Sequence, residues 1–298
     1  MKMKKMMICL LTLALLTACS PSADVGDTAQ TEPTPMVTPD TAPNPTPTPE
    51  PTDTESDTTF RYIVEGMEMT VPARRHDSLL GYSMVYDHNM LTFEKYEDYD
   101  LYMETAETNL PALQIKISKE TRTVGDVIGD LHKIGAEDSG YTRIDGCEAR
   151  VLYYIGGNQY DDLVKTYSVV QAGKAVYLIE VAYFFEASEG AGSRLEQMVA
   201  TMTFDGVPAA KELKILFRDK EMKDFSSVIG DVTRLRVGTE TGAACRDIKW
   251  TSSNESVCTV VPNGGNCDVV IKGTGVAEVT VTCGDLSAST VVRGKKSW

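Results

Sequence analysis

The sequence has 298 residues, of which 42% are hydrophobic, and a formal net charge of −14. This length and apolar content suffice for two packed domains of ordinary size. The acidic balance argues against nucleic acid as a partner and against electrostatic attachment to anionic lipid heads.

The first 19 residues have the three parts of an export signal. Three lysines within residues 2–5 precede an apolar run over residues 6–16, and Leu-Thr-Ala then leads directly to Cys19. The run is shorter than the roughly 20 residues that a membrane-spanning helix needs, so it predicts a secretory signal. The Leu-Thr-Ala-Cys segment resembles the lipobox of bacterial lipoproteins. The resemblance implies a lipid-modified Cys19 that anchors the chain on the extracytoplasmic face of the cell membrane; the alternative is an ordinary signal peptide with an incidental cysteine.

Residues 20–58 have the composition of a disordered linker. They hold nine of the thirteen prolines and eight acidic residues, but no Lys or Arg. With almost no large apolar side chains, such a segment cannot offset its ordering entropy by burial. We therefore predict an extended stalk over residues 20–58, with a ligand motif for a proline-binding domain as the alternative.

Residues 59–206 are expected to form a first folded domain. Strands are predicted over residues 81–86, 90–93, 113–117, 149–155, 163–171 and 175–184. The first two should form a hairpin through residues 87–89. A helix with apolar positions from 124 to 134 should be capped by Thr123 and Asp126, and a second helix near residue 195 by Ser193 and Glu196.

This order of elements predicts an α+β fold in which helices cover an antiparallel sheet. Together with the segment over residues 141–146 that leads into the central strands, it resembles the PsbP-like α/β/α sandwich. The resemblance implies a binding or assembly role without catalysis.

Residues 207–298 are expected to form a second, all-β domain. Residues 248–260 resemble the signature of bacterial immunoglobulin-like domains of the second group, and residues 273–282 resemble the closing strand pair of that family. The resemblance implies an immunoglobulin-like sandwich. The residues alone indicate the same, because several short strands are separated by glycine turns and Trp250 can fill the space between two sheets.

Four cysteines are candidates for disulfide bonds in this second domain. Cys258 and Cys267 lie equally far from the centre of residues 261–264, so a hairpin turning there would place them opposite each other. Cys245 would then pair with Cys283. Sequence alone leaves all three connectivities open.

Two other interpretations of these cysteines remain open, namely free thiols and a zinc site. The spacings are long for zinc, which favours close pairs such as C-x-x-C. A disulfide is the preferred interpretation because the chain is expected to be exported. Cys147 has no expected partner and is interpreted as a small buried hydrophobic residue.

Catalytic motifs are weak. His76, Asp77 and Ser78 are the residue types of a hydrolytic triad, but neighbours in sequence rarely converge on one site. His88 is expected in a solvated turn and His132 on an exposed helix edge.

Two further segments partly match ligand-binding loops. Residues 190–192, Gly-Ala-Gly, lack the third glycine of a phosphate-binding loop. The acidic residues 94–100 lack the spacing of a calcium loop and are expected to form a solvated face. We therefore expect no cofactor and no metal.

The predicted protein is a membrane-anchored surface lipoprotein without catalytic activity. Its expected partners are the membrane, through the lipid anchor, and a cell-wall glycan, an envelope protein or a host protein in adhesion. The alternative is an envelope enzyme or enzyme accessory with its site within residues 59–206. Polar groups converging on a pocket at His76 or His88 would favour that alternative.

Overall fold

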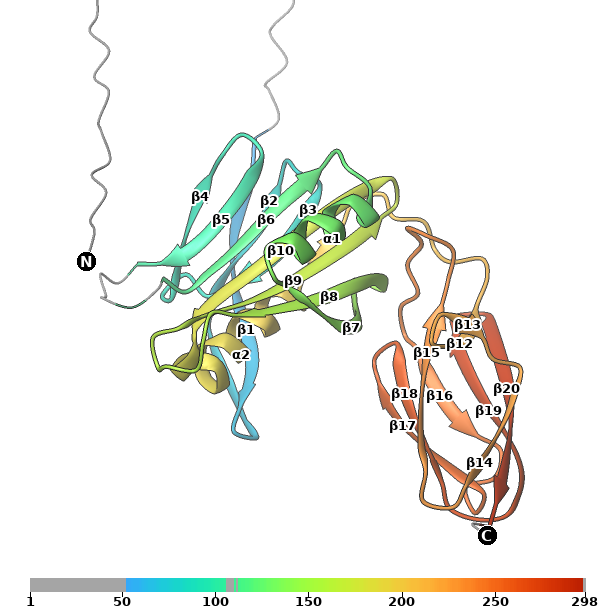
Figure 1. The fold of residues 1–298 in the computed structure, drawn as a ribbon. Helices are drawn as coiled ribbons and strands as arrows, with labels where there is room; N and C mark the ends of the chain where they lie inside the picture. The colour runs from blue at the N-terminus through green and yellow to red at the C-terminus, as the bar shows by residue number, and fades with distance from the viewer. Residues whose placement is uncertain (1–51, 106–109, 111, 297–298) are drawn as a thin grey trace, which may run out of the picture. The chain divides into compact units, whose positions relative to one another are not determined.

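The computed structural model describes residues 52–105, 110 and 112–296. The predicted signal, Cys19 and the predicted linker up to residue 51 lie outside the described residues. The chain from residue 50 onward forms one compact unit. The fold is mostly β, and its sheets are antiparallel except for one parallel strand pair (Figure 1), which confirms the prediction at this coarser level.

Residues 54–204 contribute two sheets. The four-stranded sheet has the order β1-β2-β3-β11, with β1 (Thr54–Val64), β2 (Met67–Ser78), β3 (Tyr82–Tyr86) and β11 (Thr203–Phe204). The seven-stranded sheet has the order β4-β5-β6-β10-β9-β8-β7, with β4 (Leu91–Lys95), β5 (Tyr99–Glu104), β6 (Gln114–Glu120), β7 (Glu137–Ile144), β8 (Cys147–Ile155), β9 (Leu163–Ala172) and β10 (Ala175–Phe184). A shared apolar core joins the two sheets.

Two α-helices pack against these sheets. Helix α1 (Val124–Lys133) covers one face of the seven-stranded sheet through Val127 and Leu131, in a cluster with Tyr167. Its cap is as predicted, because Thr123 accepts the N–H of Asp126 while the Asp126 carboxylate accepts from the Thr123 N–H. Helix α2 (Ser193–Val199) contributes buried side chains to the core shared by the two sheets.

The predicted capping box at the start of α2 is wrong. A short 3₁₀ turn (Phe185–Ala187) and a π turn (Ser188–Gly192) run directly into the helix, so Ser193 is already helical and caps nothing. The Glu196 side chain instead accepts from Thr166. Gly192 is required for packing, since a Cβ there would lie 2.9 Å from the Tyr183 ring.

The predicted linker extends five residues too far. Residues 54–58 belong to β1 and pair with Ala73–Asp77 of β2. The acidic residues of this segment have cationic partners that composition could not reveal. Asp53 binds Lys95 at 2.6 Å and Glu55 accepts from Arg74 at 3.2 Å.

The predicted hairpin around residues 87–89 is also wrong. Strand β3 pairs with β2 and β11, whereas β4 pairs with β5, so the turn carries the chain from one sheet to the other. Asp87 is buried in this turn and forms an ion pair with Arg194 of α2. That long-range ion pair, which the sequence pattern does not signal, fixes the crossing.

Residues 214–295 contribute the other two sheets. One has the order β13-β12-β15-β18-β17, with β12 (Lys214–Phe217), β13 (Lys220–Glu221), β15 (Val232–Gly238), β17 (Cys258–Asn263) and β18 (Asn266–Ile271). The other has the order β14-β20-β19-β16, with β14 (Asp224–Val228), β16 (Lys249–Ser252), β19 (Gly275–Cys283) and β20 (Leu286–Lys295). Trp250 is buried in the core that both sheets share, as expected.

Within the described ranges, we find no helix with the length and apolar character needed to cross a bilayer.

Candidate functional site

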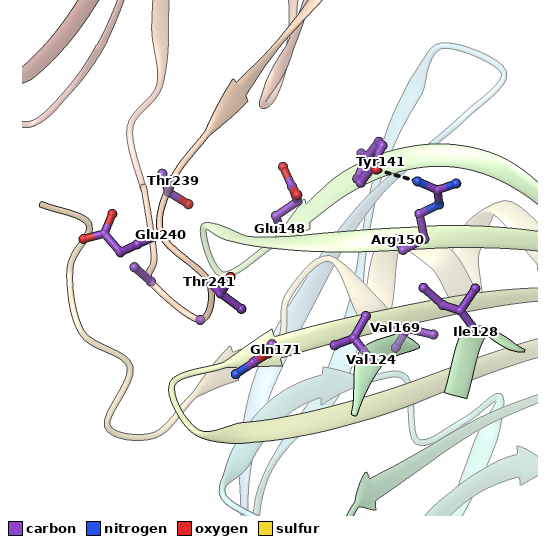
Figure 2. A pocket seen from close by; sticks show the side chains of 12 residues that line it. Val124, Ile128, Tyr141, Glu148, Arg150, Val169, Gln171, Thr239, Glu240 and Thr241 are labelled. Atoms are coloured by element: carbon purple, nitrogen blue, oxygen red, sulfur yellow. Dashed lines mark hydrogen bonds between the residues drawn. The ribbon is translucent and has the colours of Figure 1, made fainter. Parts of the chain in front are cut away.

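A pocket of about 240 Å³ is the best candidate for a binding site (Figure 2). It brings together α1, β7, β8, β9 and the loop that follows β15. Its lining residues are Val124, Ile128, Tyr141, Glu148, Arg150, Val169, Gln171, Thr239, Glu240, Thr241, Gly242 and Ala243.

The β7–β8 hairpin forms one wall of the pocket. Its two-residue turn is Asp145-Gly146, with φ of 50° and 76°, which suits a tight hairpin. Tyr141 of β7 lies opposite Arg150 of β8. In Figure 2 these side chains point toward one another, and Arg150 donates to the Tyr141 hydroxyl.

Two guanidinium groups lie over the Tyr141 ring. The Arg150 group is 4.6 Å and the Arg236 group 4.0 Å from the ring centroid. The Tyr141 hydroxyl donates to Asp219 at 3.0 Å, and burial raises the pKa of Tyr141. Cation–π contacts and hydrogen bonds together fix the aromatic ring in the wall.

Arg236 joins this wall to the strands that follow. It forms ion pairs with Glu148 and with Asp219, the latter at 2.6 Å. Hydrogen bonds from Arg236 and Tyr141 lower the pKa of Asp219. The Asp219 carboxylate is therefore charged at neutral pH, and its ion pair with Arg236 is kept there.

The loop over residues 239–243 forms the opposite wall. The Glu240 carboxylate accepts the backbone N–H groups of Lys211 at 2.6 Å and Glu212 at 3.2 Å. Gly242 has φ of 78°, and its carbonyl accepts the Gly173 N–H at 2.8 Å. A Cβ at residue 242 would lie 2.2 Å from the Gly173 carbonyl oxygen, so only glycine allows this approach.

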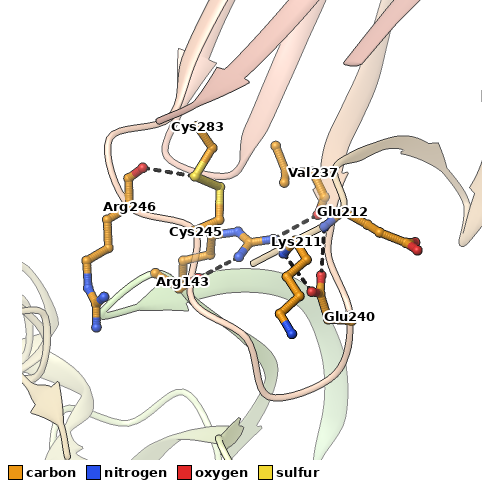
Figure 3. Close-up of a disulfide and its surroundings, with 9 residues drawn as sticks. Arg143, Lys211, Glu212, Val237, Glu240, Cys245, Arg246 and Cys283 are labelled. Atoms are coloured by element: carbon orange, nitrogen blue, oxygen red, sulfur yellow. Dashed lines mark hydrogen bonds between the residues drawn. A yellow bond between two sulfur atoms is a disulfide. The ribbon is translucent and has the colours of Figure 1, made fainter. Parts of the chain in front are cut away.

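The disulfide between Cys245 and Cys283 holds the chain just after this loop (Figure 3). Cys245 donates its N–H to the Gly146 carbonyl at 2.9 Å, and Arg143 donates to the same carbonyl at 2.6 Å. A Cβ at residue 146 would lie 2.7 Å from the Cys245 carbonyl oxygen. The bridge, the loop and the β7–β8 turn therefore form one connected support for the pocket.

The second predicted bridge does not form. Cys258 and Cys267 are buried free thiols. The β17–β18 turn lies at Gly264-Gly265, two residues beyond the expected centre. Cys258 therefore stands opposite Ile271, and Pro262 stands opposite Cys267.

Cys147 is also a free and fully buried thiol, as expected. Burial raises its pKa to about 11, so it is protonated and unreactive at neutral pH.

The pocket has an apolar floor and a polar rim. Val124, Ile128 and Val169 supply the apolar side chains. Among the described residues, the hydroxyls of Thr239 and Thr241 have no hydrogen-bond partner. These features suit a small ligand with an apolar face and a polar edge.

A second polar cluster lies around His76, inside the core. The His76 Nδ1 atom contacts the Tyr102 hydroxyl, and Tyr102 lies 3.1 Å from the Tyr82 hydroxyl. Asp100 accepts from Tyr82 at 2.7 Å and from Ser78 at 2.5 Å. Polar groups therefore do converge on His76, which sequence reasoning did not foresee.

This cluster is closed to solvent. The His76 side chain is 0% exposed, and its Nε2 atom has no hydrogen-bond partner within the described ranges. Burial lowers the pKa of His76, although Asp100 and Asp53 oppose that effect. The ring is therefore neutral at pH 7 and inaccessible to a substrate.

The other predicted positions have separate environments. His132 is exposed, as expected, and its Nε2 atom lies 3.5 Å from Asp138. His88 is half-buried rather than solvated, with a buried Nδ1 atom. The acidic segment 94–100 is not uniformly solvated, because Asp100 is buried in the His76 cluster.

Within residues 52–105, 110 and 112–296, no group of three or more His, Cys, Asp or Glu side chains is placed to hold a metal ion.

Sequence reasoning did not identify the pocket. Three of its lining residues, Tyr141, Glu148 and Arg150, lie on the β7–β8 hairpin, and Arg143 follows Tyr141 in the same alternation without lining the pocket. That alternation of aromatic and charged residues around Asp-Gly is a detectable signal. The partners Arg236 and Asp219 lie far away in sequence and carry no such signal.

No family model matches this chain, and no curated protein matches it. Among solved structures, a polysaccharide lyase aligns over 81% of this chain and 39% of its own, with 7% sequence identity and a TM-score of 0.21. This chain therefore spans about two fifths of that enzyme, and the similarity is too low to inform either fold or activity.

Proposed function

We propose that this protein is a lipid-anchored, extracytoplasmic binding protein without catalytic activity, and that its pocket binds one sugar unit of a cell-wall glycan. The export signal with Cys19 supports the location. Within the β-rich fold we assign residues 59–206 to a PsbP-like α+β sandwich and residues 207–298 to an immunoglobulin-like sandwich. The shared core around Trp250 supports the second assignment.

The composition of the pocket is the main support for glycan binding. A sugar ring has apolar C–H faces and a polar edge of hydroxyl groups. The floor of Val124, Ile128 and Val169 suits the face, while Gln171 and Thr241 on the rim suit the hydroxyls. The pocket volume of about 240 Å³ suits one ring rather than a long segment.

A catalytic role is the second candidate, because polar groups converge on His76. The buried ring has no route to a substrate in this conformation. Catalysis would require the two sheets to separate around His76, whereas binding at the pocket requires no such opening. We therefore favour binding.

The test is a binding measurement with purified wall glycan and the full chain. Thr241 is exposed at the pocket rim, so Thr241→Trp should fill the pocket and reduce affinity at least tenfold. Thr121→Trp is the matched control, because Thr121 is an exposed threonine outside the lining. Equal affinity of both variants and the original chain would refute the pocket as the glycan site.

A further inference from the structure

Strand β1 is an exposed edge of the four-stranded sheet. It has 11 residues, and among the strands that the structure describes it pairs with β2 alone (Figure 1). Long edge strands offer unpaired N–H and C=O groups to other strands, and proteins usually cover or shorten them.

Pro72 reveals which backbone groups of β1 point outward. Pro72 stands opposite Thr59 and has no N–H to donate. Opposite residues of an antiparallel pair exchange either two hydrogen bonds or none, so this pair exchanges none. The N–H and C=O of Thr59 therefore point away from β2, as do those of Asp57, Arg61 and Ile63 by alternation.

Only the end of this edge is covered. The Gln197 side chain accepts the Ile63 N–H at 2.7 Å and donates to the Ile63 carbonyl at 2.9 Å, which agrees with the alternation. In the described part of the chain, the outward backbone groups of Asp57, Thr59 and Arg61 have no partner. The open edge thus spans the middle of β1.

The charges along this edge are self-complementary. The Asp57 side chain is 95% exposed and the Arg61 side chain 73% exposed, four residues apart with Thr59 midway. Within the chain, Asp57 lies 3.9 Å from Arg74 and Arg61 lies 3.1 Å from Glu68. Such exposed ion pairs contribute little free energy, so both side chains are available to a partner strand. In an antiparallel pair of identical strands centred on Thr59, each Asp57 stands opposite Arg61 of the other strand. Opposite charges directly across a pair are favourable, and like charges are unfavourable.

We propose that β1 pairs with β1 of a second copy of this chain, antiparallel and about a two-fold axis at Thr59. The two four-stranded sheets then form one continuous sheet across the dimer. A shift by two residues would place Glu55 opposite Arg61. That register is disfavoured because the Glu55 side chain is only 32% exposed and accepts from Tyr86 at 2.5 Å and from Arg74 at 3.2 Å. This inference does not depend on the glycan pocket or on the lipid anchor.

The test is the mass of the full chain in detergent, measured by sedimentation over a concentration series. The original chain should show a monomer–dimer equilibrium. Thr59→Pro removes the central N–H, which has no partner in the monomer, and should abolish the dimer. Thr59→Ala is the matched control and should still dimerise, because it keeps that N–H.

Charge exchange provides a second test that does not alter the backbone. Arg61→Asp places two acids opposite each other and should weaken the dimer at least tenfold. Combining Asp57→Arg with Arg61→Asp restores opposite charges and should recover dimerisation. Any of three results would overturn the proposal. The first is a monomer at every concentration. The second is a dimer that survives Thr59→Pro, and the third is a double variant that dimerises no better than Arg61→Asp; either of these would indicate another surface or another β1 partner.

Discussion

Single side chains in this protein depend on partners far away in sequence. Arg236 is the strongest example, because it lies over the Tyr141 ring and pairs with Glu148 and Asp219. A substitution at any of these four positions should therefore affect the pocket wall as well as local stability.

His76 should make the stability of the protein depend on pH. Burial lowers its pKa below the ordinary value of 6.5, so the folded state favours the neutral ring. Well above pH 6.5 the His76 ring is neutral in both the folded and the unfolded chain, so its lowered pKa does not change the free energy of unfolding. As pH falls below 6.5 the unfolded chain gains a proton that the folded chain resists, so the free energy of unfolding should fall, by up to about 1 kcal/mol between pH 7 and pH 5.5.

Urea denaturation at these two pH values measures this effect. His76→Phe should remove it, because phenylalanine does not titrate, whereas His132→Ala at an exposed position should retain it. The same pH dependence in His76→Phe and the original chain would contradict the assignment to His76.

Among the elements, helix α1 connects stability with the pocket. Its capping box fixes the first turn, and Val124 of that turn lines the pocket floor. Thr123→Ala should lower the free energy of unfolding by about 1 kcal/mol, because it removes the cap. Thr123→Ser keeps a hydroxyl and should lose much less. Equal losses for both substitutions in urea denaturation would show that the cap is not the cause.

The predictability of each element follows from the range of its interactions. Helix α1 and strands β8 to β10 were predicted because their apolar periodicity and turn residues are local. Strands β1 and β2 were missed because many of their side chains are exposed, and because Glu55 and Arg74 neutralise each other across the ladder. The hairpin between β3 and β4 was wrongly predicted because a turn sequence does not reveal which sheet receives the next strand.

The candidate site was less predictable than the fold. Cys245 and Cys283 were expected to pair, and they do. Cys258 and Cys267 do not pair, because two successive glycines move the turn by two residues. The pocket itself depends on contacts such as Gly242 with Gly173, which carry no pattern within either segment.

At the scale of the whole molecule, the disulfide stabilises the loop that forms one pocket wall. It closes a sequence separation of 38 residues. Loss of this constraint on the unfolded chain should cost about 3–4 kcal/mol. Urea denaturation of a Cys245→Ala, Cys283→Ala double variant should show that loss, together with weaker glycan binding.

A reducing agent provides the matched control for this prediction. It should destabilise the original chain and leave the double variant unchanged. If the original chain were equally stable with and without reductant, the bridge would not contribute as described.

The proposed location at the membrane depends on acylation of Cys19, and this proposal is the central claim of the account. Intact-mass measurement of the chain recovered from the membrane tests it most directly. We predict an N-terminus at Cys19 that carries the added mass of lipid, and its loss in Cys19→Ser together with release from the detergent phase. An unmodified Cys19 in a chain that still partitions with membranes would contradict the account.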